Sequence, residues 1–285
     1  MKKRCLSAVG IAEWVRDERI VTFSSVPAML HDLLTHPDVR QDDLATLTLP
    51  GVGGANCPEE LKTLFRERFG LEVTVSYGLT EAPTSVTLSK DVPYPERSSG
   101  VAQPQYALHI LDSEGNELPA GETGEICVGP SREGTFAGVY TTMLGYWKRN
   151  DATQAALAGG LLHTGDVGSV DRDGNLFVHD RKSDLINRGG ANVYPAEIER
   201  VLHEDSRVAA CAVVGVPDTR LGERVMAAVR LAREATATEA ELLAHCRENL
   251  ARYKVPERIL LVDAFPETPM GKIRKRDTKR WFKDL

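Results

Sequence analysis

The stretch from His163 to Glu199 constrains the fold of this chain more than any other part of the sequence. Two apolar runs in it flank the polar sequence Asp171–Asn175, in which Gly174 tolerates a positive φ, so the stretch predicts a hairpin of two strands. The runs are Val167–Val170 and Leu176–His179. Beyond Arg181 the pattern changes to mixed strands and helices. The stretch therefore predicts a junction between a β-rich segment and a C-terminal segment of different architecture.

The N-terminal segment, residues 1–96, alternates short apolar runs with amphipathic helices, which is typical of an α/β fold. Pro27 lies in the first turn of a helix predicted over Val26–Leu34, and Ser25 is its expected cap. A second helix is predicted over Pro58–Phe69 and ends at Gly70. We expect the apolar residues of this second helix to share one buried face; they are Leu61, Leu64, Phe65 and Phe69.

A buried strand is predicted after the second helix, over Val73–Val75. The sequence SYGLTE, Ser76–Glu81, follows this strand and is expected to form a loop. Open α/β sheets bind ligands at the carboxyl ends of their strands, so this loop is a candidate binding element.

Residues 97–180 form a predicted β-rich, barrel-like subdomain that follows a composition change at Pro93 and Pro95. Short apolar runs such as Ala107–Leu111 and Gly124–Val128 alternate with turn signals. This alternation is typical of a β-meander or a β-barrel. The hairpin around Gly174 is expected to end the subdomain near residue 180.

Residues 181–285 are predicted to form a smaller, mobile C-terminal α+β domain. A helix is expected to begin at Pro195, and another at Thr238, where Glu241 completes a capping box. Strands are predicted over 211–216 and 225–231. The predicted fold class is thus an α/β segment plus a β-barrel-like subdomain, with a smaller C-terminal α+β domain.

The composition excludes several classes of function. A formal net charge of −6 argues against a nucleic-acid-binding protein, which needs a basic surface. The five cysteines are scattered without a C-x-x-C pair, and no apolar run reaches the roughly 20 residues of a membrane-spanning helix. A reduced, cytoplasmic protein with no membrane span is expected.

Four motifs occur in a fixed order: SYGLTEAPT (76–84), HTGD (163–166), Arg181 and TPMGKIRKR (268–276). In this order they resemble the motifs of the adenylate-forming superfamily, which includes acyl-CoA synthetases, adenylation domains of peptide synthetases and luciferases. The resemblance extends from about Ile11 to the C-terminus, and the wording GGANCP (53–58) favours acyl-CoA ligases. The cofactors implied are ATP or AMP, Mg²⁺ and coenzyme A.

The resemblance assigns roles to the first motif. Tyr77 corresponds to the aromatic residue that stacks on adenine, and Gly78 belongs to the same AMP-binding segment. Thr80 corresponds to the hydroxyl that reaches the phosphate, and Glu81 to the carboxylate that helps to hold Mg²⁺. Thr80 and Glu81 are therefore candidate catalytic residues.

Other residues complete the AMP site that the resemblance implies. Gly54 and Ala55 belong to a small-residue segment where the backbone passes close to adenine and the acyl group. Asp166 corresponds to the carboxylate that accepts hydrogen bonds from both ribose hydroxyls, and Arg181 to the arginine that contacts ribose or phosphate.

The remaining candidates concern domain motion and the second half-reaction. The hinge falls at Lys182 and Ser183, where Ser183 replaces the more usual aspartate or lysine. Gly189 and Gly190 resemble the loop that lines the pantetheine tunnel for coenzyme A. Lys272 corresponds to the lysine that stabilises charge at the phosphates and carboxylate during adenylation.

Each residue also has an ordinary interpretation when it is taken alone. Tyr77 would be an exposed loop tyrosine, Asp166 a turn residue next to glycine, and Arg181 a solvated surface charge. Lys272 is one of seven cations between residues 272 and 283, a run that usually marks a solvated tail. The order of the motifs along the chain favours the functional interpretation.

A complete member of the superfamily carries a Ser/Thr/Gly-rich phosphate loop ahead of the first motif, and the sequence is expected to represent a truncated form without it. The expected activity is that of an acyl-CoA ligase-like protein that binds AMP or acyl adenylate and performs the thioester-forming step with coenzyme A. The alternatives are half of a split ATP-dependent carboxylate-CoA ligase, whose partner subunit or homodimer covers the missing half-domain, and a non-catalytic nucleotide-binding remnant. The carboxylic acid, and the choice between coenzyme A and a carrier-protein thiol, stay open.

Overall fold

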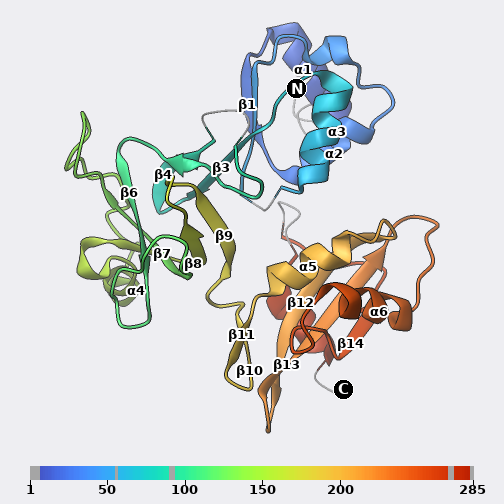
Figure 1. Ribbon diagram of the computed structural model, residues 1–285. Coiled ribbons are helices and arrows are strands. Elements are labelled where there is room, and N and C mark those ends of the chain that lie inside the picture. Colours follow the sequence, from blue (N-terminus) through green and yellow to red (C-terminus); the bar gives the residue numbers. More distant parts are fainter. Residues whose placement is uncertain (1–6, 55–56, 90–93, 269–272, 283–285) are drawn as a thin grey trace. The chain divides into compact units, whose positions relative to one another are not determined.

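The computed structural model describes residues 7–54, 57–89, 94–268 and 273–282. The chain divides into two compact units (Figure 1). Unit 1 comprises Met1–Thr164 and Gly168–Val178, and unit 2 comprises Gly165–Val167 and His179–Leu285. No helix in the described ranges is long and apolar enough to cross a membrane.

Unit 1 begins with an α/β layer in which three parallel strands are continued by an antiparallel pair, in the order β1-β2-β3-β4-β5. The strands are β1 (Thr22–Ser25), β2 (Leu49–Val52), β3 (Thr74–Leu79), β4 (Ala82–Leu88) and β5 (Val101–Ala102). The helices are α1 (Ala8–Glu18), α2 (Pro27–Thr35), the 3₁₀ helix η2 (Gln41–Leu44) and α3 (Glu59–Phe69). The predicted α/β pattern is confirmed.

The packing of α3 in this layer differs in one residue from the buried face predicted for this helix. Leu61, Phe65 and Phe69 of α3 are buried, four residues apart, and α3 ends at Gly70 in the left-handed conformation as expected. Leu64 is 42% exposed, because its position on the helix lies about 100° from the centre of the buried stripe. The prediction that Leu64 is buried is therefore wrong.

Two further local predictions fail for tertiary reasons. Ser25 does not cap α2: it ends β1, its hydroxyl donates to the Gly51 carbonyl at 3.2 Å, and Val26 takes the N-cap position without a side-chain bond. The sequence Ser76–Glu81 is not a loop throughout, since β3 continues to Leu79. Pairing with β4 extends the strand and leaves Thr80 and Glu81 as the turn.

The β-rich part of the chain contains a four-stranded sheet in the order β6-β7-β8-β9. The elements are β6 (Tyr106–Leu111), β7 (Gly124–Pro130), α4 (Asn150–Ala156), the 3₁₀ helix η3 (Ala158–Gly160), β8 (Leu162–Val170) and β9 (Leu176–Arg181). The Gly174 amide donates to the Asp171 carbonyl at 3.1 Å in the turn between β8 and β9. The predicted hairpin is confirmed.

Unit 2 is built on a sheet in the order β11-β10-β13-β12, with β14 parallel to β13. Its strands are β10 (Ile186–Arg188), β11 (Ala191–Val193), β12 (Val208–Asp218), β13 (Gly222–Leu231) and β14 (Arg258–Leu261). Its helices are α5 (Pro195–His203), α6 (Glu239–Asn249), α7 (Lys275–Thr278) and the 3₁₀ helix η4 (Lys279–Phe282).

Strand alternation divides β12 and β13 of unit 2 between two cores. Odd-numbered residues such as Val213 and Val225 pack with α5 and α6, which lie on one face of the sheet (Figure 1). Even-numbered residues such as Val214 and Met226 pack with the C-terminal aromatics Phe265 and Phe282. The C-terminal segment is therefore part of the fold of unit 2 and covers its second face.

The N-terminus of α6 carries the predicted capping box. The Glu241 amide donates to the Thr238 hydroxyl at 3.3 Å, and the Thr238 amide donates to the Glu241 carboxylate at 2.8 Å. Two amides that the helix itself cannot satisfy are thereby bonded.

We expect Thr238→Ala to lower the free energy of unfolding by about 1 kcal/mol, because it removes the cap of α6. Urea unfolding followed by circular dichroism measures the change. Thr236→Ala is the matched control, since Thr236 is exposed just ahead of the helix. Equal effects of the two substitutions would contradict a capping role.

Candidate functional site

Asp166 and Arg181 are two sequence-predicted site residues that the structure brings together. Asp166 lies on β8 and Arg181 ends β9, and the two strands are neighbours in the sheet. The Arg181 Nε atom lies 2.8 Å from Asp166 Oδ1. The Asp166 side chain is 8% exposed, whereas that of Arg181 is 61% exposed. The pair fixes a nearly buried carboxylate beside a cation that reaches solvent.

The residues after Arg181 form a compact turn. The Arg181 carbonyl accepts hydrogen bonds from the Asp184 amide at 3.0 Å and the Leu185 amide at 3.2 Å. The Lys182 amide donates to the Gly165 carbonyl at 2.8 Å, which ties the turn to β8 next to Asp166. The predicted hinge residues Lys182 and Ser183 therefore lie in this turn, with Ser183 exposed.

Glu81 occupies the turn between β3 and β4, and it has a partner that the sequence did not reveal. Its carboxylate accepts a hydrogen bond from the Tyr146 hydroxyl at 2.8 Å, and its carbonyl accepts one from the Met143 amide at 2.7 Å. Thr80 is exposed in the same turn. The aromatic pair of Gly145-Tyr-Trp147 was the available signal for this contact, but its distance in sequence from Glu81 hid it.

Tyr77 lies within β3, and its amide donates to the Thr87 hydroxyl at 3.2 Å. Its half-buried ring packs against the apolar clusters of the β-rich part that include Val128 and Ile126. Gly78 follows it as an exposed strand residue. The strand thus holds the tyrosine ring at a fixed place beside the turn that carries Thr80 and Glu81.

The small-residue segment after β2 lies beside β3. A Cβ atom added at Gly53 would lie 2.9 Å from the Ser76 hydroxyl and 3.1 Å from the Ser76 carbonyl oxygen, so close approach of these strands requires glycine. Gly54 is exposed, with φ of 74°. Ala55, the last predicted residue of this segment, lies outside the described residues.

Gly189 and Gly190 connect β10 and β11 as a two-residue hairpin. Both have positive φ, 61° and 85°, as a type I′ turn requires. The Gly189 amide donates to the Leu221 carbonyl at 2.6 Å, and the Gly190 amide donates to the Asn187 side chain at 3.1 Å. The loop is therefore anchored to the turn that precedes β13.

Lys272 lies outside the described residues, but Lys275, three residues later, belongs to a charge network that the sequence did not reveal. The Lys275 Nζ atom lies 2.7 Å from the Glu199 carboxylate of α5. The same carboxylate accepts a hydrogen bond from the Val213 amide of β12 at 2.8 Å. The network therefore joins the C-terminal segment, α5 and the central sheet of unit 2.

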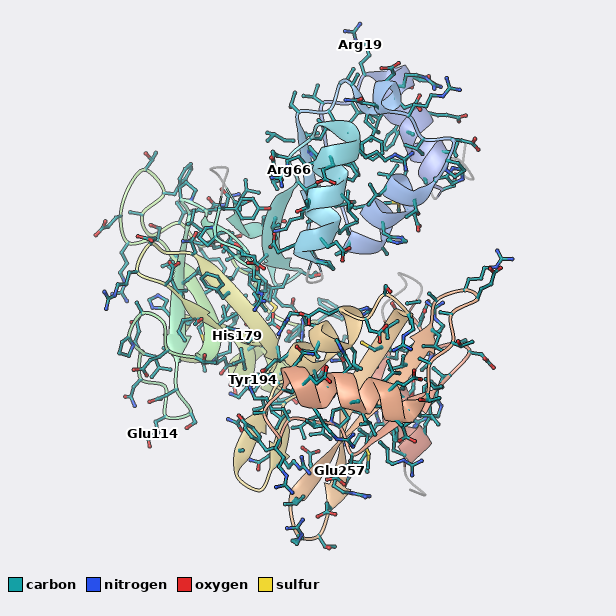
Figure 2. The ribbon with its side chains drawn as sticks, turned by 45° about the vertical axis from the view of Figure 1, so that its right-hand side comes forward. Arg19, Arg66, Glu114, His179, Tyr194 and Glu257 are labelled. Atoms are coloured by element: carbon teal, nitrogen blue, oxygen red, sulfur yellow. The ribbon has the colours of Figure 1, made fainter. Side chains whose placement is uncertain are left out.

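Asp180, directly before Arg181, extends this network to the end of β9. Its carboxylate accepts the Ala196 amide in the first turn of α5 at 2.8 Å, where the helix dipole favours a negative charge. The rings of His179, which precedes Asp180, and of Tyr194, the N-cap residue of α5, lie 6.2 Å apart (Figure 2). The start of α5 is thus fixed to the strand that leads into the predicted hinge.

Burial and charge shift the pKa values of these groups. Burial raises the pKa of Glu199 and of Asp180, and the positive charge of Lys275 partly opposes both shifts. Burial alone would lower the pKa of Lys275, but attraction to Glu199 and Asp180 raises it above its ordinary value. Lys275 therefore stays positively charged at neutral pH.

A hollow in unit 2 adjoins the network. It is lined by Asp184, Ile273, Arg274, Lys275, Arg276, Asp277 and Arg280. Four of these residues are cationic and two are anionic, and Asp184 lies at the end of the turn that follows Arg181. The hollow can accept an anionic group by charge-assisted hydrogen bonds.

The structure divides the predicted site residues between the units. Tyr77, Thr80 and Glu81 belong to unit 1. Asp166 and Arg181, the predicted hinge residues and the glycine pair belong to unit 2.

Models of two protein families match this chain, one in its N-terminal half and one near its C-terminus. The family model described as AMP-binding enzyme matches residues 2–147. The model of the AMP-binding enzyme C-terminal domain matches residues 197–272.

Individual proteins agree with these matches. A feruloyl-CoA synthase from Amycolatopsis sp. is 38% identical over 271 residues, which cover 94% of this chain and 53% of the relative. A fatty acid–[acyl-carrier-protein] ligase from Streptomyces coeruleorubidus is 38% identical over 285 residues, covering 98% of this chain and 53% of the relative. The ATP-bound crystal structure of MatB from Rhodopseudomonas palustris is 29% identical, with a TM-score of 0.86, and covers 98% of this chain and 54% of the other. The chain thus spans about half the length of the proteins it matches.

We expect Lys275→Ala to destabilise unit 2 by about 2 kcal/mol, because it leaves the carboxylates of Glu199 and Asp180 without their cation. Urea unfolding measures the change. Lys279→Ala is the matched control, since its Nζ atom lies 3.3 Å from Glu223 in a more exposed pair, and we expect it to cost less than about 0.5 kcal/mol.

The pH dependence of the free energy of unfolding tests the Lys275–Glu199 ion pair in a second way. The raised pKa of Lys275 predicts that its stabilisation is complete below pH 10.5 and is lost as the pH rises through the raised value. A difference between wild type and Lys275→Ala that vanishes already at neutral pH would contradict the network.

Proposed function

Because the chain belongs to the AMP-binding enzyme family, we propose that it binds an acyl adenylate and transfers the acyl group to the thiol of coenzyme A. The observation that carries the proposal is the ion pair of Asp166 and Arg181 directly before the hinge turn. It combines an acceptor for a sugar diol with a cation for a phosphate. Acyl-CoA ligases among the relatives favour a carboxylic acid as the source of the acyl group.

The carboxylate of Asp166 would accept hydrogen bonds from the two ribose hydroxyls. A carboxylate has acceptor sites for several donors, so Arg181 orients it while the sugar binds. The exposed end of Arg181 would contact ribose or the α-phosphate. Tyr77 would stack on adenine, next to the backbone of Gly54, Ala55 and Gly78.

Glu81 and Thr80 would serve the phosphate end of the nucleotide. Mg²⁺ is commonly held by one or two carboxylates together with phosphate oxygens and water, so Glu81, oriented by Tyr146, fits such an ion. The ion, when bound, would neutralise phosphate charge. Thr80 would donate its hydroxyl to a phosphate oxygen, and Lys272 would stabilise negative charge at the phosphate and carboxylate during adenylation.

In the thioester-forming step, the coenzyme A sulfur attacks the acyl carbonyl. A carbon–sulfur bond forms, the carbon–oxygen bond to the phosphate breaks, AMP leaves, and the thiol proton passes to solvent. A turn at Lys182 and Ser183 would let the residues that follow it bring Gly189 and Gly190 to the pantetheine arm. The cationic hollow beside Asp184 fits the phosphates of coenzyme A.

An assay of the purified chain with alternative substrates tests the proposal. Feruloyl adenylate or a long-chain fatty acyl adenylate, mixed with coenzyme A, should give acyl-CoA and AMP above the uncatalysed rate. A carrier-protein thiol in place of coenzyme A distinguishes the acceptors. Nucleotide binding by calorimetry without acyl transfer from either adenylate would overturn the proposal and identify a binding protein.

Parallel reactions with ATP and free acid measure adenylation separately. Product from these reactions would extend the activity to both half-reactions. Product only after a second chain is added, with a complex visible by light scattering, would identify a split ligase.

We expect Asp166→Asn to weaken AMP binding about 10- to 100-fold, because the amide has fewer acceptor sites for the ribose diol and no charge to pair with Arg181. Calorimetric titration with AMP gives the Kd. Asp173→Asn is the control, since Asp173 is exposed at the tip of the β8–β9 hairpin. An unchanged Kd in Asp166→Asn would remove this residue from the site.

A further inference from the structure

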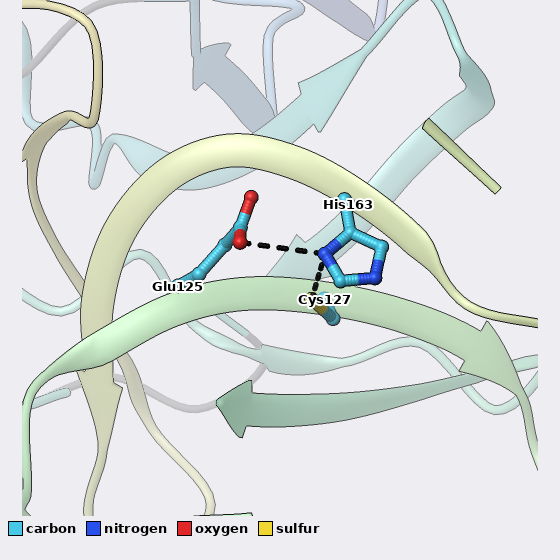
Figure 3. A group of neighbouring side chains, drawn as sticks. All are labelled: Glu125, Cys127 and His163. Carbon is cyan, nitrogen blue, oxygen red and sulfur yellow. Dashed lines mark hydrogen bonds and ion pairs between the residues drawn. The ribbon is translucent and has the colours of Figure 1, made fainter. Parts of the chain in front are cut away.

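A cluster of Glu125, Cys127 and His163 lies on β7 and β8 of unit 1 (Figure 3). Glu125 and Cys127 are two residues apart on β7, so strand alternation puts both on one face of the sheet. Their side chains point toward the His163 ring from the neighbouring strand (Figure 3). One carboxylate oxygen, one sulfur and one ring nitrogen thus lie within 4.8 Å of one another.

Two of the three ligand–ligand distances in this cluster match the edges of a tetrahedral zinc site, and the third, between Glu125 and Cys127, is within 4.8 Å. His163 Nδ1 lies 3.3 Å from Glu125 Oε2 and 3.4 Å from Cys127 Sγ. Zinc bonds of about 2.0 to 2.3 Å to nitrogen, oxygen and sulfur in tetrahedral geometry place such ligand atoms about 3.3 to 3.6 Å apart. The ring nitrogen therefore needs little movement to share an ion with both neighbours.

His163 Nδ1 can form only one of these two hydrogen bonds at a time. His163 Nδ1 carries either a proton or a lone pair in the plane of the neutral ring. It can donate to Glu125 in one tautomer or accept from the Cys127 thiol in the other, but it cannot do both at once. A cation placed between the three atoms binds the carboxylate, the thiolate and the lone pair together.

The burial of the three residues also suits a metal ion. Cys127 is fully buried, and the side chains of Glu125 and His163 are 13% and 26% exposed. Solvent can therefore reach the histidine side of the cluster and supply a fourth ligand. A borderline-soft set of one nitrogen, one sulfur and one oxygen favours Zn²⁺ over Mg²⁺ or Ca²⁺, which prefer oxygen ligands alone.

We propose that Glu125, Cys127 and His163 form a zinc site that joins β7 to β8, with water as the fourth ligand. Thr164, the next residue on β8, points to the opposite face of the strand, and its hydroxyl donates to the Ile126 carbonyl at 2.7 Å. Zinc would thereby fix β8 from one face while the threonine fixes it from the other, immediately before Asp166. Binding releases the thiol proton of Cys127 to solvent.

Cobalt titration of the purified, metal-free chain tests the site directly. Co²⁺ replaces Zn²⁺ in tetrahedral sites, and its absorption spectrum contains a thiolate-to-metal charge-transfer band when sulfur is a ligand. We expect one equivalent of Co²⁺ to give this band and one equivalent of Zn²⁺ to abolish it. Absence of the band in the wild-type chain would overturn the proposal, whatever the variants do.

Variants then assign the ligands. Cys127→Ala and His163→Ala should each weaken Zn²⁺ binding about 100-fold or more in competition with a chromophoric chelator, and Cys127→Ala should remove the band. Cys57→Ala, which removes a buried thiol elsewhere in unit 1, and His31→Ala, which removes an exposed imidazole, should change neither. Equal Kd values for Cys127→Ala and Cys57→Ala would overturn the assignment.

Glu125→Gln provides a variant of unchanged size for the case in which Cys127→Ala does not fold. It should weaken Zn²⁺ binding about 10-fold or more while the metal-free protein keeps its circular dichroism spectrum. An unchanged Kd in Glu125→Gln would exclude the carboxylate as a ligand. None of these readouts uses enzymatic activity, so they stand apart from the proposed acyl transfer.

Discussion

The carboxylate of Asp180 and the Glu199–Lys275 ion pair set the local structure on which the rest of unit 2 depends. Asp180 binds the first turn of α5 at the end of β9, and Glu199 on the same helix binds both Lys275 and the β12 backbone. These bonds define the distance between the end of β9 and the C-terminal segment. Buried charges that are hydrogen-bonded in this way specify one arrangement of the elements at some cost in desolvation.

The hydrogen bond of Asp180 also bears on the predicted hinge at Lys182 and Ser183. The turn at Lys182 and Ser183 begins one residue after Arg181, which is paired with Asp166 on β8. An ion pair holds the strand ahead of the turn, and the hydrogen bond from the Ala196 amide to Asp180 spans the turn from α5 to the end of β9. Rotation about the turn would therefore break this hydrogen bond as well as change a few dihedral angles.

Local sequence signals predicted the elements whose geometry is decided locally. The Thr238 capping box, the Gly174 turn and the proline that opens α5 were all predictable, because neighbours in sequence make their bonds. Ser25 and Leu64 were mispredicted, since a strand bond and the packing direction of a whole helix decided their positions. Three contacts could not be predicted from local patterns, because they join residues 36 to 76 positions apart in the sequence. They are the bond of Glu81 to Tyr146, the ion pair of Lys275 with Glu199, and the cluster around His163.

A single-turnover reaction of the chain with stoichiometric acyl adenylate and coenzyme A, stopped at short times, tests the central claim most directly. Acyl transfer predicts that acyl-CoA and AMP appear together, in equal amounts and at one rate that depends on coenzyme A. Release of AMP with free acid, at a rate that coenzyme A does not change, would show hydrolysis of the adenylate. That result would contradict the account.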